Sequence, residues 1–400
     1  MKDSVKNSVH STGATLSIHA IPSSTTHVQN PGAITRVALL NDLTAFGRCS
    51  LAVALPVISS FGIQACPIPT AILSNHLGFP TYSYDDYSEG LGTIFGGLQD
   101  LGVAFDAISC GFLGSAKQIP MILSFLRQTA TIASMTATAT SPNTEATVYA
   151  TVSDGNHCSC PDGVMTRPLF LLDPVMGDHG QPYATIDAAY VSSLRELAMW
   201  ADILTPNLTE ACLLTGTPYI EDSWNETKLT LLCEQIETMT RSTPHYFRDN
   251  SPISSHDSSL DNCHDSSHDS SLDNCHDTSC DNLRDSLRVN SRNGHLDRHR
   301  DHPKIVITGL QHPDGLGNYV WENHQGSLFV TASTGDARPG TGDLFAAVLL
   351  GAFLRGASFE KAVQTAASFV ARAIAYTQNH KVPTQEGVLF EPLLPYLHEG

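Results

Sequence analysis

Short, predominantly apolar runs alternate with longer segments of helical spacing along most of the chain. A run in which nearly every side chain is apolar is typical of a parallel strand that is buried on both faces. The runs of this kind are Val37–Leu40, Ala65–Pro69, Ala107–Cys110, Leu169–Leu172, Ile203–Leu204 and Ile305–Thr308. We therefore expect a largely parallel sheet.

The segments between these runs repeat apolar residues every three or four positions, which predicts helices. They are Ser50–Phe61, Tyr84–Leu101, Ala116–Gln128, Ile186–Trp200, Asn225–Thr238, Asp343–Arg355 and Phe359–Tyr376. Asn318–Glu322 and Leu328–Thr331 predict an antiparallel pair at one sheet edge. The alternation indicates an α/β fold with a doubly wound, mostly parallel central sheet and helices on both faces. Ligands of such sheets bind beyond the carboxyl ends of the strands, so the loops there are the candidate site.

Three segments differ in composition from the rest. Residues 1–34 are rich in Ser, Thr and His, and we expect a disordered extension there. Residues 35–400 should form one domain, interrupted by insertions at about residues 129–165 and 241–302. The first insertion, rich in Thr, Ala and Ser without a helical period, predicts a surface loop with a strand pair around Ala146–Val152.

The second insertion is low in complexity and carries a duplication. Residues 256–267 recur as residues 268–279 with one Ser-to-Thr change. Two copies with a single Leu each cannot bury a stack of repeats, so the segment predicts a disordered linker. Its His, Cys and Asp residues could bind Zn²⁺ or Ni²⁺ opportunistically, although a solvated linker is favoured.

Composition narrows the class of protein. The chain has 400 residues, 41% of them hydrophobic, and a net charge of −18, which argues against nucleic acid or an anionic membrane as the main partner. No apolar run approaches the ~18–20 residues of a membrane span. The N-terminal stretch lacks the apolar region of a secretory signal, and the 10 cysteines form no Cys-x-x-Cys pair. We therefore expect reduced thiols and a cytoplasmic protein.

The segment Gly340-Thr341-Gly342-Asp343 opens directly into an apolar helix. Glycines let the backbone approach a phosphate, and the first amides of a helix point unpaired N–H groups and the positive end of the dipole at it. Asp343 would then lie where a base reaches a substrate hydroxyl. The alternative is a loop whose Asp stabilises a helix N-terminus without any chemistry.

Two strand exits carry further oxygen ligands. Asp173 and Asp178 follow the Leu169–Leu172 strand, and Thr205, Asn207 and Glu210 follow Ile203–Leu204. Hard oxygen groups suit Mg²⁺, which usually holds a nucleotide through its phosphates and water. Each also has a structural explanation, because Asp-Pro starts turns and Asn207 with Glu210 could form a capping box. Taken together with the glycine motif, the loops favour a kinase.

Other loops supply a candidate acceptor pocket. Asn41 and Asp42 leave the first strand and could bond a polar ring edge, while His76 and Phe112 offer flat rings for stacking. Core packing is the alternative for Phe112. Arg48 and Arg338 are candidate phosphate contacts, with surface pairing equally open. No Walker-type Gly-x-x-x-x-Gly-Lys-Ser/Thr loop and no Gly-x-Ser-x-Gly elbow is present.

These motifs together resemble the pyridoxal/pyridoxamine kinases of the ribokinase-like superfamily. The resemblance rests on Asp42–Pro56 (DLTAFGRCSLAVALP), Gly111–Ser115 (GFLGS), Asp173–Gly180 (DPVMGDHG), Thr205–Cys212 (TPNLTEAC) and Gly340–Asp343 (GTGD). It covers about Arg36–Arg127, Arg167–Thr238 and the chain from Pro303 onward. The extension and the insertions have no counterpart in it.

The resemblance implies ATP-dependent phosphorylation of the 5′-hydroxymethyl group of a B6 vitamer. Asp343 would be the general base, and the amides of Gly340, Thr341, Gly342 and Asp343 would hold the developing charge. His76 and Phe112 would contact the pyridine ring, with Asn41 and Asp42 at its polar edge. The implied ATP-binding residues are Asp173, Asp178, Thr205, Asn207, Glu210, Thr308 and Thr341, with residues 177–183 as a covering loop.

The resemblance also implies the cofactor and the assembly. Mg²⁺ would be held mainly through water ordered by Asp173 and Glu210, with a monovalent cation such as K⁺ near Thr205. The expected partners are a B6 vitamer and ATP, without nucleic acid or membrane, and the expected assembly is a homodimer.

Two positions depart from the family pattern. Many pyridoxal kinases have Gln-Ser-His where this chain has Asn41-Asp42-Leu43, which is more similar to the pyrimidine kinases of thiamine synthesis. Leu77 stands where a Thr commonly follows the Asn-His pair. A hydroxymethylpyrimidine kinase is therefore the nearest alternative, and a sugar or nucleoside kinase of the superfamily is more remote. A catalytically idle vitamin-binding protein of the same fold is an alternative of another class.

Overall fold

The computed structural model describes residues 34–138, 167–221, 224–241, 302–332 and 338–397. The expected disordered extension lies outside these residues except for Ile34. So do the strand pair expected around Ala146–Val152 and the duplicated segment of residues 256–279.

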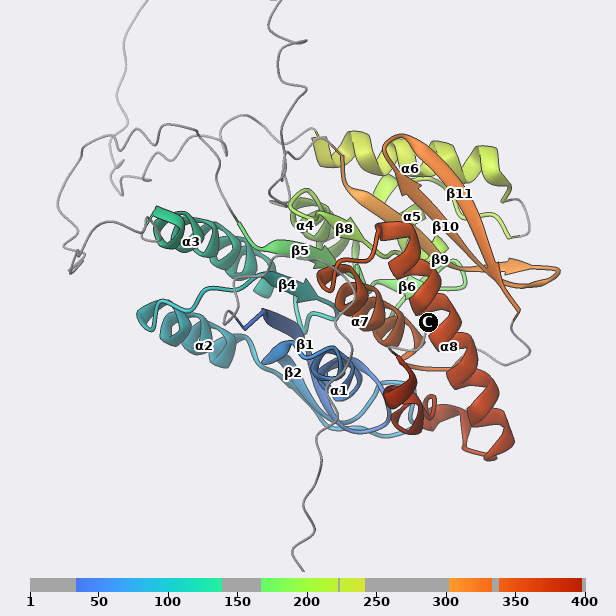
Figure 1. Cartoon of the computed structure of the whole chain (residues 1–400), viewed down its shortest axis with the longest axis horizontal. Helices are drawn as coiled ribbons and strands as arrows, with labels where there is room; N and C mark the ends of the chain where they lie inside the picture. Colours follow the sequence, from blue (N-terminus) through green and yellow to red (C-terminus); the bar gives the residue numbers. More distant parts are fainter. Residues whose placement is uncertain (1–33, 139–166, 222–223, 242–301, 333–337, 398–400) are drawn as a thin grey trace, which may run out of the picture.

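A nine-stranded sheet forms the centre of the described chain, in the order β11-β10-β9-β8-β5-β4-β1-β2-β3 (Figure 1). Its strands are β1 (Arg36–Phe46), β2 (Gln64–Asn75), β3 (Tyr84–Asp86), β4 (Ala107–Cys110), β5 (Leu169–Leu172), β8 (Ile203–Leu204), β9 (Lys304–His312), β10 (Gly315–Glu322) and β11 (Gln325–Thr331). A separate small hairpin joins β6 (Gly177–Asp178) to β7 (Gln181–Pro182).

The six strands from β9 to β2 in this order are parallel, whereas β10, β11 and β3 are antiparallel to their neighbours. The strand order changes direction at β1, which pairs with β2 on one side and β4 on the other. In doubly wound sheets such a switch point opens a crevice at the carboxyl ends of the strands. The exits of β1, β4, β5, β8 and β9 therefore share one edge of the sheet, which we call the carboxyl edge.

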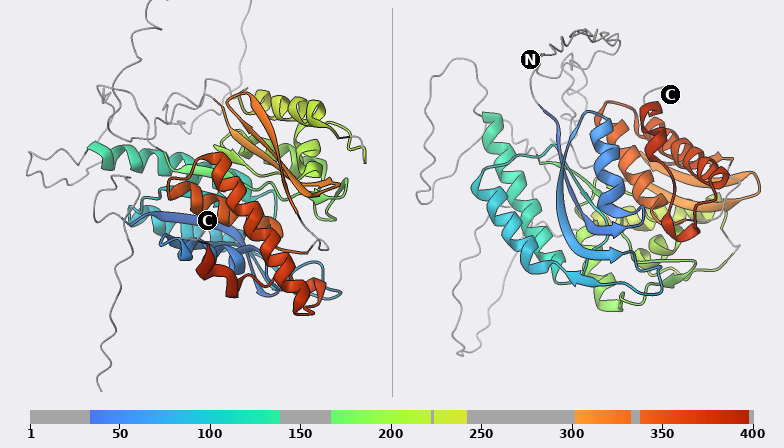
Figure 2. Two further views of the ribbon diagram at one scale, coloured as in Figure 1. Left: turned by 45° about the vertical axis from the view of Figure 1, so that its right-hand side comes forward. Right: turned by 90° about the horizontal axis from the view of Figure 1, so that it is seen from below.

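Helices cover both faces of the sheet (Figures 1 and 2). On one face lie α1 (Ser50–Ser60), α7 (Thr341–Leu354) and α8 (Phe359–Asn379), and on the other α2 (Ser88–Asp100), α3 (Gln118–Thr138), α4 (Ala188–Ala198), α5 (Leu208–Thr215) and α6 (Glu226–Arg241). Alternate residues of β1 serve the two cores: Val37 and Leu39 pack towards α1 and α7, and Ala38 and Leu40 pack the other way. This two-sided burial explains the continuous apolar runs.

The expected fold class is confirmed, and several strands lie where the sequence placed them. β4, β5 and β8 have the predicted bounds, and the predicted antiparallel pair is β10 with β11. The helix expected over Tyr84–Leu101 is shorter than predicted, because Tyr84–Asp86 forms β3 and α2 starts only at Ser88. Asp86 accepts hydrogen bonds from the backbone and hydroxyl of Ser88, which stabilises this start.

The first insertion begins later than the sequence indicated. α3 continues to Thr138, although residues from 129 onward were expected to form a surface loop. Thr129 is buried, and its hydroxyl donates to the carbonyls of Phe125 and Leu126 on the preceding turn. Ala and Thr can continue a helix that has already been nucleated, so the missing apolar period was a poor guide to its end.

The thiols and the helix hydropathy of the described residues bear on two other expectations, those of reduced cysteines and of no membrane span. The five cysteines among the described residues, Cys49, Cys66, Cys110, Cys212 and Cys233, have free thiols. Within the same residues, no helix combines the length and hydropathy that crossing a membrane requires. The C-terminal part of the described chain forms two short 3-10 helices, η2 (Thr384–Glu386) and η3 (Glu391–Tyr396).

Two helical glycines give a matched test of this packing. A Cβ built on Gly351 of α7 would lie 2.2 Å from the ring of Phe61, whereas one on Gly97 of α2 meets no atom within 4 Å. Gly351→Ala should therefore destabilise the protein by about 1–3 kcal/mol through overpacking. Gly97→Ala should stabilise it by about 0.5–1 kcal/mol because Ala favours the helix. Urea denaturation measures both, and a stabilised Gly351→Ala would contradict the packing described.

Candidate active site

The glycine motif forms the first turn of α7 at the carboxyl edge. Gly340 is the N-cap in the left-handed conformation, with φ 77°. A Cβ on Gly340 would lie 1.8 Å from the carbonyl oxygen of Arg48, so only glycine fits this approach. Asp343 lies in the first turn, where the unpaired amides and the positive end of the helix dipole favour an anion.

Asn41 connects β1 to this turn. β1 continues to Phe46 across a register shift between Asn41 and Leu43, so Asn41 and Asp42 lie within the strand and not beyond its end as expected. Its Nδ2 donates to Oδ1 of Asp343 at 2.9 Å, and its Oδ1 accepts from the backbone N–H groups of Phe112 and Asp42. The side chain is buried, and its three hydrogen bonds fix the orientation of the amide. Asn41 therefore positions the Asp343 carboxylate relative to β1 and the exit of β4.

Asp42 is buried beside Asn41 and is satisfied within the chain. Its Oδ2 accepts from the hydroxyl of Thr44 and its Oδ1 from the hydroxyl of Ser50. Burial raises the pKa of Asp42, while these hydroxyls and the nearby His76 lower it. Both oxygens are thus engaged with protein groups, and its charge lies close to Asp343.

Sequence reasoning missed Ser50. This buried residue at the start of α1 has φ 53°, a conformation that is uncommon outside glycine. It donates its hydroxyl to Asp42 and its backbone N–H to Asp343. Backbone strain at a residue that binds two carboxylates is typical of functional sites. The chain offered no local signal for it, because nothing in the sequence around Ser50 marks a left-handed residue.

Asp343 is partly accessible to solvent, but the surrounding protein atoms remove much of the water from its carboxylate. This desolvation, together with the charge of Asp42, raises the pKa of Asp343 to about 6, although Ser50 and Asn41 lower it. A carboxylate with such a pKa is a stronger base than an ordinary aspartate and is still ionised at neutral pH. Hydrogen bonds from neutral donors, rather than a cation, hold it in place.

Asp173, at the end of β5, faces the same turn of α7. A Cβ on Gly342 would lie 3.8 Å from its Oδ2, and Thr205 donates its hydroxyl to its Oδ1 at 3.1 Å. Desolvation and the charge of Asp343 both raise the pKa of Asp173. The structure thus brings together the predicted acidic residue at the exit of β5 and the predicted base in the first turn of α7.

Glu210 and Asn207 form the capping box that the sequence offered as an alternative. The Asn207 side chain accepts from the Glu210 N–H, and Glu210 Oε2 accepts from the Asn207 N–H at 2.8 Å. Glu210 is buried, and desolvation and the charge of Asp173 raise its pKa well above the usual value. Capping the helix does not require Glu210 to lie close to a second carboxylate, that of Asp173. Glu210 can therefore have a second role besides the structural one.

The hairpin β6–β7 lies over the start of α5. Asn207 donates to the carbonyl of Gly177, and the Gly180 N–H donates to the hydroxyl of Thr209. Asp178 is on this hairpin with a side chain that is 52% exposed, and it binds the N–H of the adjacent His179. Asp178 is thus more exposed than the enclosed carboxylates, although its charge still contributes to the raised pKa of Glu210.

A pocket of about 90 Å³ opens on the other side of the glycine turn. Its lining includes Thr308 within β9, Thr341 and Gly342 of α7, and apolar residues of α8. Thr308 is held beside Asn207 by a bridge between the two chain segments. Two of the residues implied for nucleotide binding, Thr308 and Thr341, therefore lie in one pocket.

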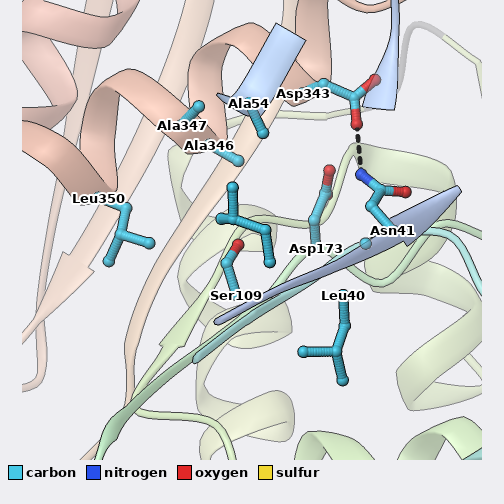
Figure 3. A pocket seen from close by; sticks show the side chains of 11 residues that line it. Leu40, Asn41, Ala54, Ser109, Asp173, Asp343, Ala346, Ala347 and Leu350 are labelled. Carbon is cyan, nitrogen blue, oxygen red and sulfur yellow. Dashed lines mark hydrogen bonds between the residues drawn. The ribbon is translucent and has the colours of Figure 1, made fainter. Parts of the chain in front are cut away.

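A second, smaller cavity lies beneath the carboxylates (Figure 3). Asn41, Asp173 and Asp343 project towards it from three different elements, and Ser109 and apolar residues of α7 complete its wall. Its volume of about 20 Å³ is enough for a single water.

The two ring residues are placed differently. Phe112 is partly exposed, and its backbone is held by Asn41 and by the hydroxyl of Thr70, so it is not a core residue. His76 accepts from the Gly78 N–H through Nδ1, and its Nε2 lies 2.5 Å from the carbonyl of Gln385. It also packs on Phe79.

The two arginines bind protein groups. Arg48 forms an ion pair with Glu391 at 2.7 Å, and Arg338 donates to the carbonyls of Val382, Pro383 and Gly387. Of the alternatives for these residues, internal pairing is thus the one that the structure shows.

No model of a protein family matches this chain, and no curated protein sequence matches it. Solved structures do. A Bacteroides thetaiotaomicron protein designated a phosphomethylpyrimidine kinase is 24% identical, over 93% of this chain and 96% of that chain, with a TM-score of 0.64. The pyridoxal kinase of Lactobacillus plantarum is 22% identical, over 91% and 97%, with a TM-score of 0.63. That of Leishmania donovani, in complex with ADP and pyridoxamine, is 16% identical, over 91% and 95%, with a TM-score of 0.62.

The chain has the ribokinase-like fold of these kinases. This agrees with the resemblance drawn from the motifs. In the ribokinase-like fold of this chain, the carboxyl edge holds the glycine turn, Asn41 and the enclosed acidic residues together.

The enclosed carboxylates predict a pH-dependent stability. The pKa of Asp173 is raised in the folded state, so ionising Asp173 destabilises the fold. This destabilisation is absent below pH 3.8 and grows as pH rises towards about 7. Asp173→Asn removes this cost and can still accept from Thr205. The variant should be more stable than the parent at pH 8, with the difference vanishing at pH 3.5.

The measurement is thermal unfolding at both pH values. Asp178→Asn, at the half-exposed position on the hairpin, is the matched control and should change neither midpoint appreciably. An equal gain for Asp173→Asn at both pH values would mean that desolvation of the charge is not the cause.

Proposed function

We propose that this chain is an ATP-dependent kinase that phosphorylates the 5′-hydroxymethyl group of a B6 vitamer. The observation that carries the proposal is the placement of Asp343, an enclosed carboxylate in the first turn of α7 that Asn41 and Ser50 hold. A base and a set of unpaired helix amides thus occupy one turn. The shared fold with pyridoxal and phosphomethylpyrimidine kinases supports this reading.

Asp343 acts as the general base in the proposed reaction. It takes the proton of the substrate hydroxyl as that oxygen attacks the γ-phosphorus of ATP, and ADP leaves. The raised pKa of Asp343 suits it to this role. The amides of Gly340, Thr341 and Gly342 then hold the charge on the transferred phosphoryl group, as the N-terminus of a helix does for other anions.

The nucleotide would lie between the glycine turn and the exits of β8 and β9. Thr308 and Thr341 line the pocket there, and the β6–β7 hairpin with Asp178 would cover the phosphates. Closure of such a loop excludes water, which would otherwise hydrolyse ATP.

Mg²⁺ fits the donors on this edge. Among the described residues, neither Asp173 nor Glu210 has a Lys or Arg partner, and both have raised pKa values, so added positive charge would be favourable. Asp173 and Glu210 would hold the ion mainly through water, with Asn207 beside them and K⁺ near Thr205. Bound Mg²⁺ would neutralise charge on the phosphates.

The vitamer would lie between His76 and Phe112 at the exits of β2 and β4. Asp42 would set the electrostatics of this pocket, because its charge raises the pKa of Asp343. We further propose that the protein works in the cytoplasm, in salvage of the B6 cofactor, and as a homodimer.

One observation favours a second candidate, phosphorylation of hydroxymethylpyrimidine. Asn41-Asp42 within β1 is more similar to the pyrimidine kinases, and the Bacteroides protein designated a phosphomethylpyrimidine kinase was also solved with pyridoxal. Both acceptors carry a hydroxymethyl group on a six-membered aromatic ring, so the same base serves either. A vitamin-binding protein without activity remains the alternative from another class.

Replacing Asp343, the proposed base, and comparing several acceptors should distinguish a B6 vitamer kinase from a pyrimidine kinase and from a binding protein without activity. Asp343→Asn should lower turnover of the preferred acceptor by about 10²- to 10⁴-fold while ADP binding persists, because the general base is lost and the amides remain. Formation of ADP is measured with pyridoxal, pyridoxamine, pyridoxine and hydroxymethylpyrimidine. Asp314→Asn, at an exposed turn, is the control.

Turnover of the pyrimidine alone would replace the vitamer as substrate. Binding of a vitamer to the parent without any formation of ADP would favour the idle binding protein. Undiminished turnover by Asp343→Asn would remove Asp343 from the reaction.

The pH profile tests the electrostatic role of Asp42. Activity should fall as pH decreases through about 6, because protonated Asp343 cannot accept a proton. Asp42→Asn removes the negative charge that raises this pKa, so the acidic limb of kcat/KM should shift to lower pH. A limb that stays in place in Asp42→Asn, as it should in Asp314→Asn, would show that the charge of Asp42 is not felt at the base.

A further inference from the structure

Three potential metal ligands meet on the side of the sheet opposite to the carboxyl edge. Glu237 lies near the end of α6, His302 precedes β9, and His324 is in the turn between β10 and β11. His302 lies two residues before the amino end of β9, whereas Thr308, farther along the same strand, lies beside Asn207. The cluster is therefore separate from the proposed kinase site.

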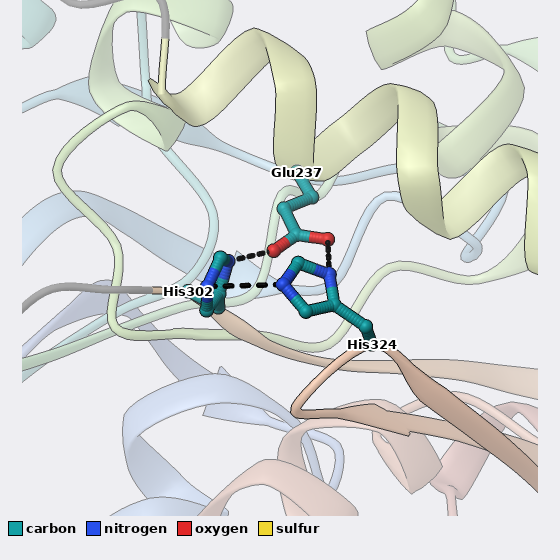
Figure 4. Close-up of side chains that lie close together, drawn as sticks. All are labelled: Glu237, His302 and His324. Carbon is teal, nitrogen blue, oxygen red and sulfur yellow. Dashed lines mark hydrogen bonds and ion pairs between the residues drawn. The ribbon is translucent and has the colours of Figure 1, made fainter.

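The three side chains form a closed ring of contacts (Figure 4). The Glu237 carboxylate contacts Nδ1 of His302 through one oxygen and Nδ1 of His324, at 3.1 Å, through the other. The Nε2 atoms of the two histidines face each other at 3.0 Å. Trp321 donates its indole N–H to the same carboxylate at 3.3 Å.

An ion-pair network explains only part of this arrangement. The Glu237 side chain is 5% exposed, and no Lys or Arg among the described residues pairs with it. Nδ1 of His324 is within hydrogen-bond distance of the carboxylate, whereas the contact between Nδ1 of His302 and the other oxygen forms no hydrogen bond and leaves both atoms buried without one. The two Nε2 atoms face each other and cannot both carry a proton, so a cation bound between them would use both lone pairs.

We propose that Glu237, His302 and His324 form a binding site for a divalent transition-metal ion, with Zn²⁺ the best match. Imidazole nitrogens are preferred ligands of Zn²⁺, and two nitrogens at about 2.0–2.1 Å from a tetrahedral ion lie about 3.3–3.4 Å apart. The two Nε2 atoms are 3.0 Å apart, so they need to separate by only a few tenths of an ångström to hold the ion. Glu237 lies beside Nδ1 of both rings, as carboxylates commonly do behind metal-bound histidines, and water completes the coordination.

The site would connect parts of the chain that are distant in sequence. Glu237 and His324 are 87 positions apart, and His302 and His324 are 22 apart. A bound ion would fix the start of β9 and the β10–β11 turn beside the end of α6. Its role would thus be to stabilise this corner of the domain rather than to take part in phosphoryl transfer.

Trp321 provides a readout that other histidines of the chain cannot mimic. Its ring centroid lies 6.4 Å from that of His324, so a paramagnetic ion in the site should quench its fluorescence. We would titrate the full-length, EDTA-treated protein with Ni²⁺ and then add Zn²⁺ as a competitor. Saturable quenching that Zn²⁺ reverses is expected, and Trp321→Phe should abolish it.

His324→Asn is the decisive variant. Residue 324 has φ 60°, which Asn tolerates well, so the turn is preserved while an imidazole is lost. Metal affinity should fall by about tenfold or more. His312→Asn, on β9 outside the cluster, is the matched control and should behave like the parent.

Thermal unfolding gives a second measurement on the same proteins. Zn²⁺ should raise the midpoint of the parent and of His312→Asn but not that of His324→Asn, because the ion binds only the folded site. Equal quenching of the parent and His324→Asn, or no saturable quenching of the parent, would overturn the proposal and leave a hydrogen-bonded His–His–Glu cluster.

Discussion

Enclosed negative charge without a basic partner is the constraint on which the carboxyl edge depends. Within the described residues, Asp42, Asp173, Glu210 and Asp343 are held by hydroxyls, an amide and backbone N–H groups rather than by Lys or Arg. Each carboxylate raises the pKa of a neighbour, so the edge is destabilised by its own charges. Such a cost persists where the surrounding structure imposes it, and added positive charge relieves it. The same groups that weaken the apo fold are those suited to a nucleotide with its metal ion.

The sheet makes this concentration of charge possible. Parallel strands end at one edge, and alternate residues of each strand pack into two separate cores, which leaves the exits fixed from both faces. Asn41 fixes the position of Asp343 within this rigid edge, because its amide hydrogen-bonds to β1, to the residues that follow β4 and to the first turn of α7. A side chain with three hydrogen bonds to three elements can place a carboxylate more precisely than the loop that carries it.

Much of the fold followed from the sequence, because buried parallel strands are read directly from apolar runs. β4, β5 and β8 were bounded correctly, and the capping box at Asn207 was recognised from two residues at the right spacing. The failures share a cause, because each feature depends on structure that the local pattern of apolar residues does not show. β3 depends on pairing with the preceding strand β2, the end of α3 on continuation without an apolar period, and Ser50 on a strained conformation that only the assembled site imposes. His302 ends the segment whose histidines suggested opportunistic binding of Zn²⁺ or Ni²⁺, but its proposed partners His324 and Glu237 lie outside that segment and carry no motif that marks them.

Residues 382–391 contact both the loop that precedes α7 and two loops from the first part of the chain. Arg338 holds the carbonyls of Val382, Pro383 and Gly387, Arg48 pairs with Glu391, and His76 contacts Gln385. During synthesis, the exits of β1 and β2 therefore leave the ribosome long before the residues that brace them. The carboxyl edge must be among the last parts of the domain to assemble, and a nascent chain would hold its glycine turn unsupported until then.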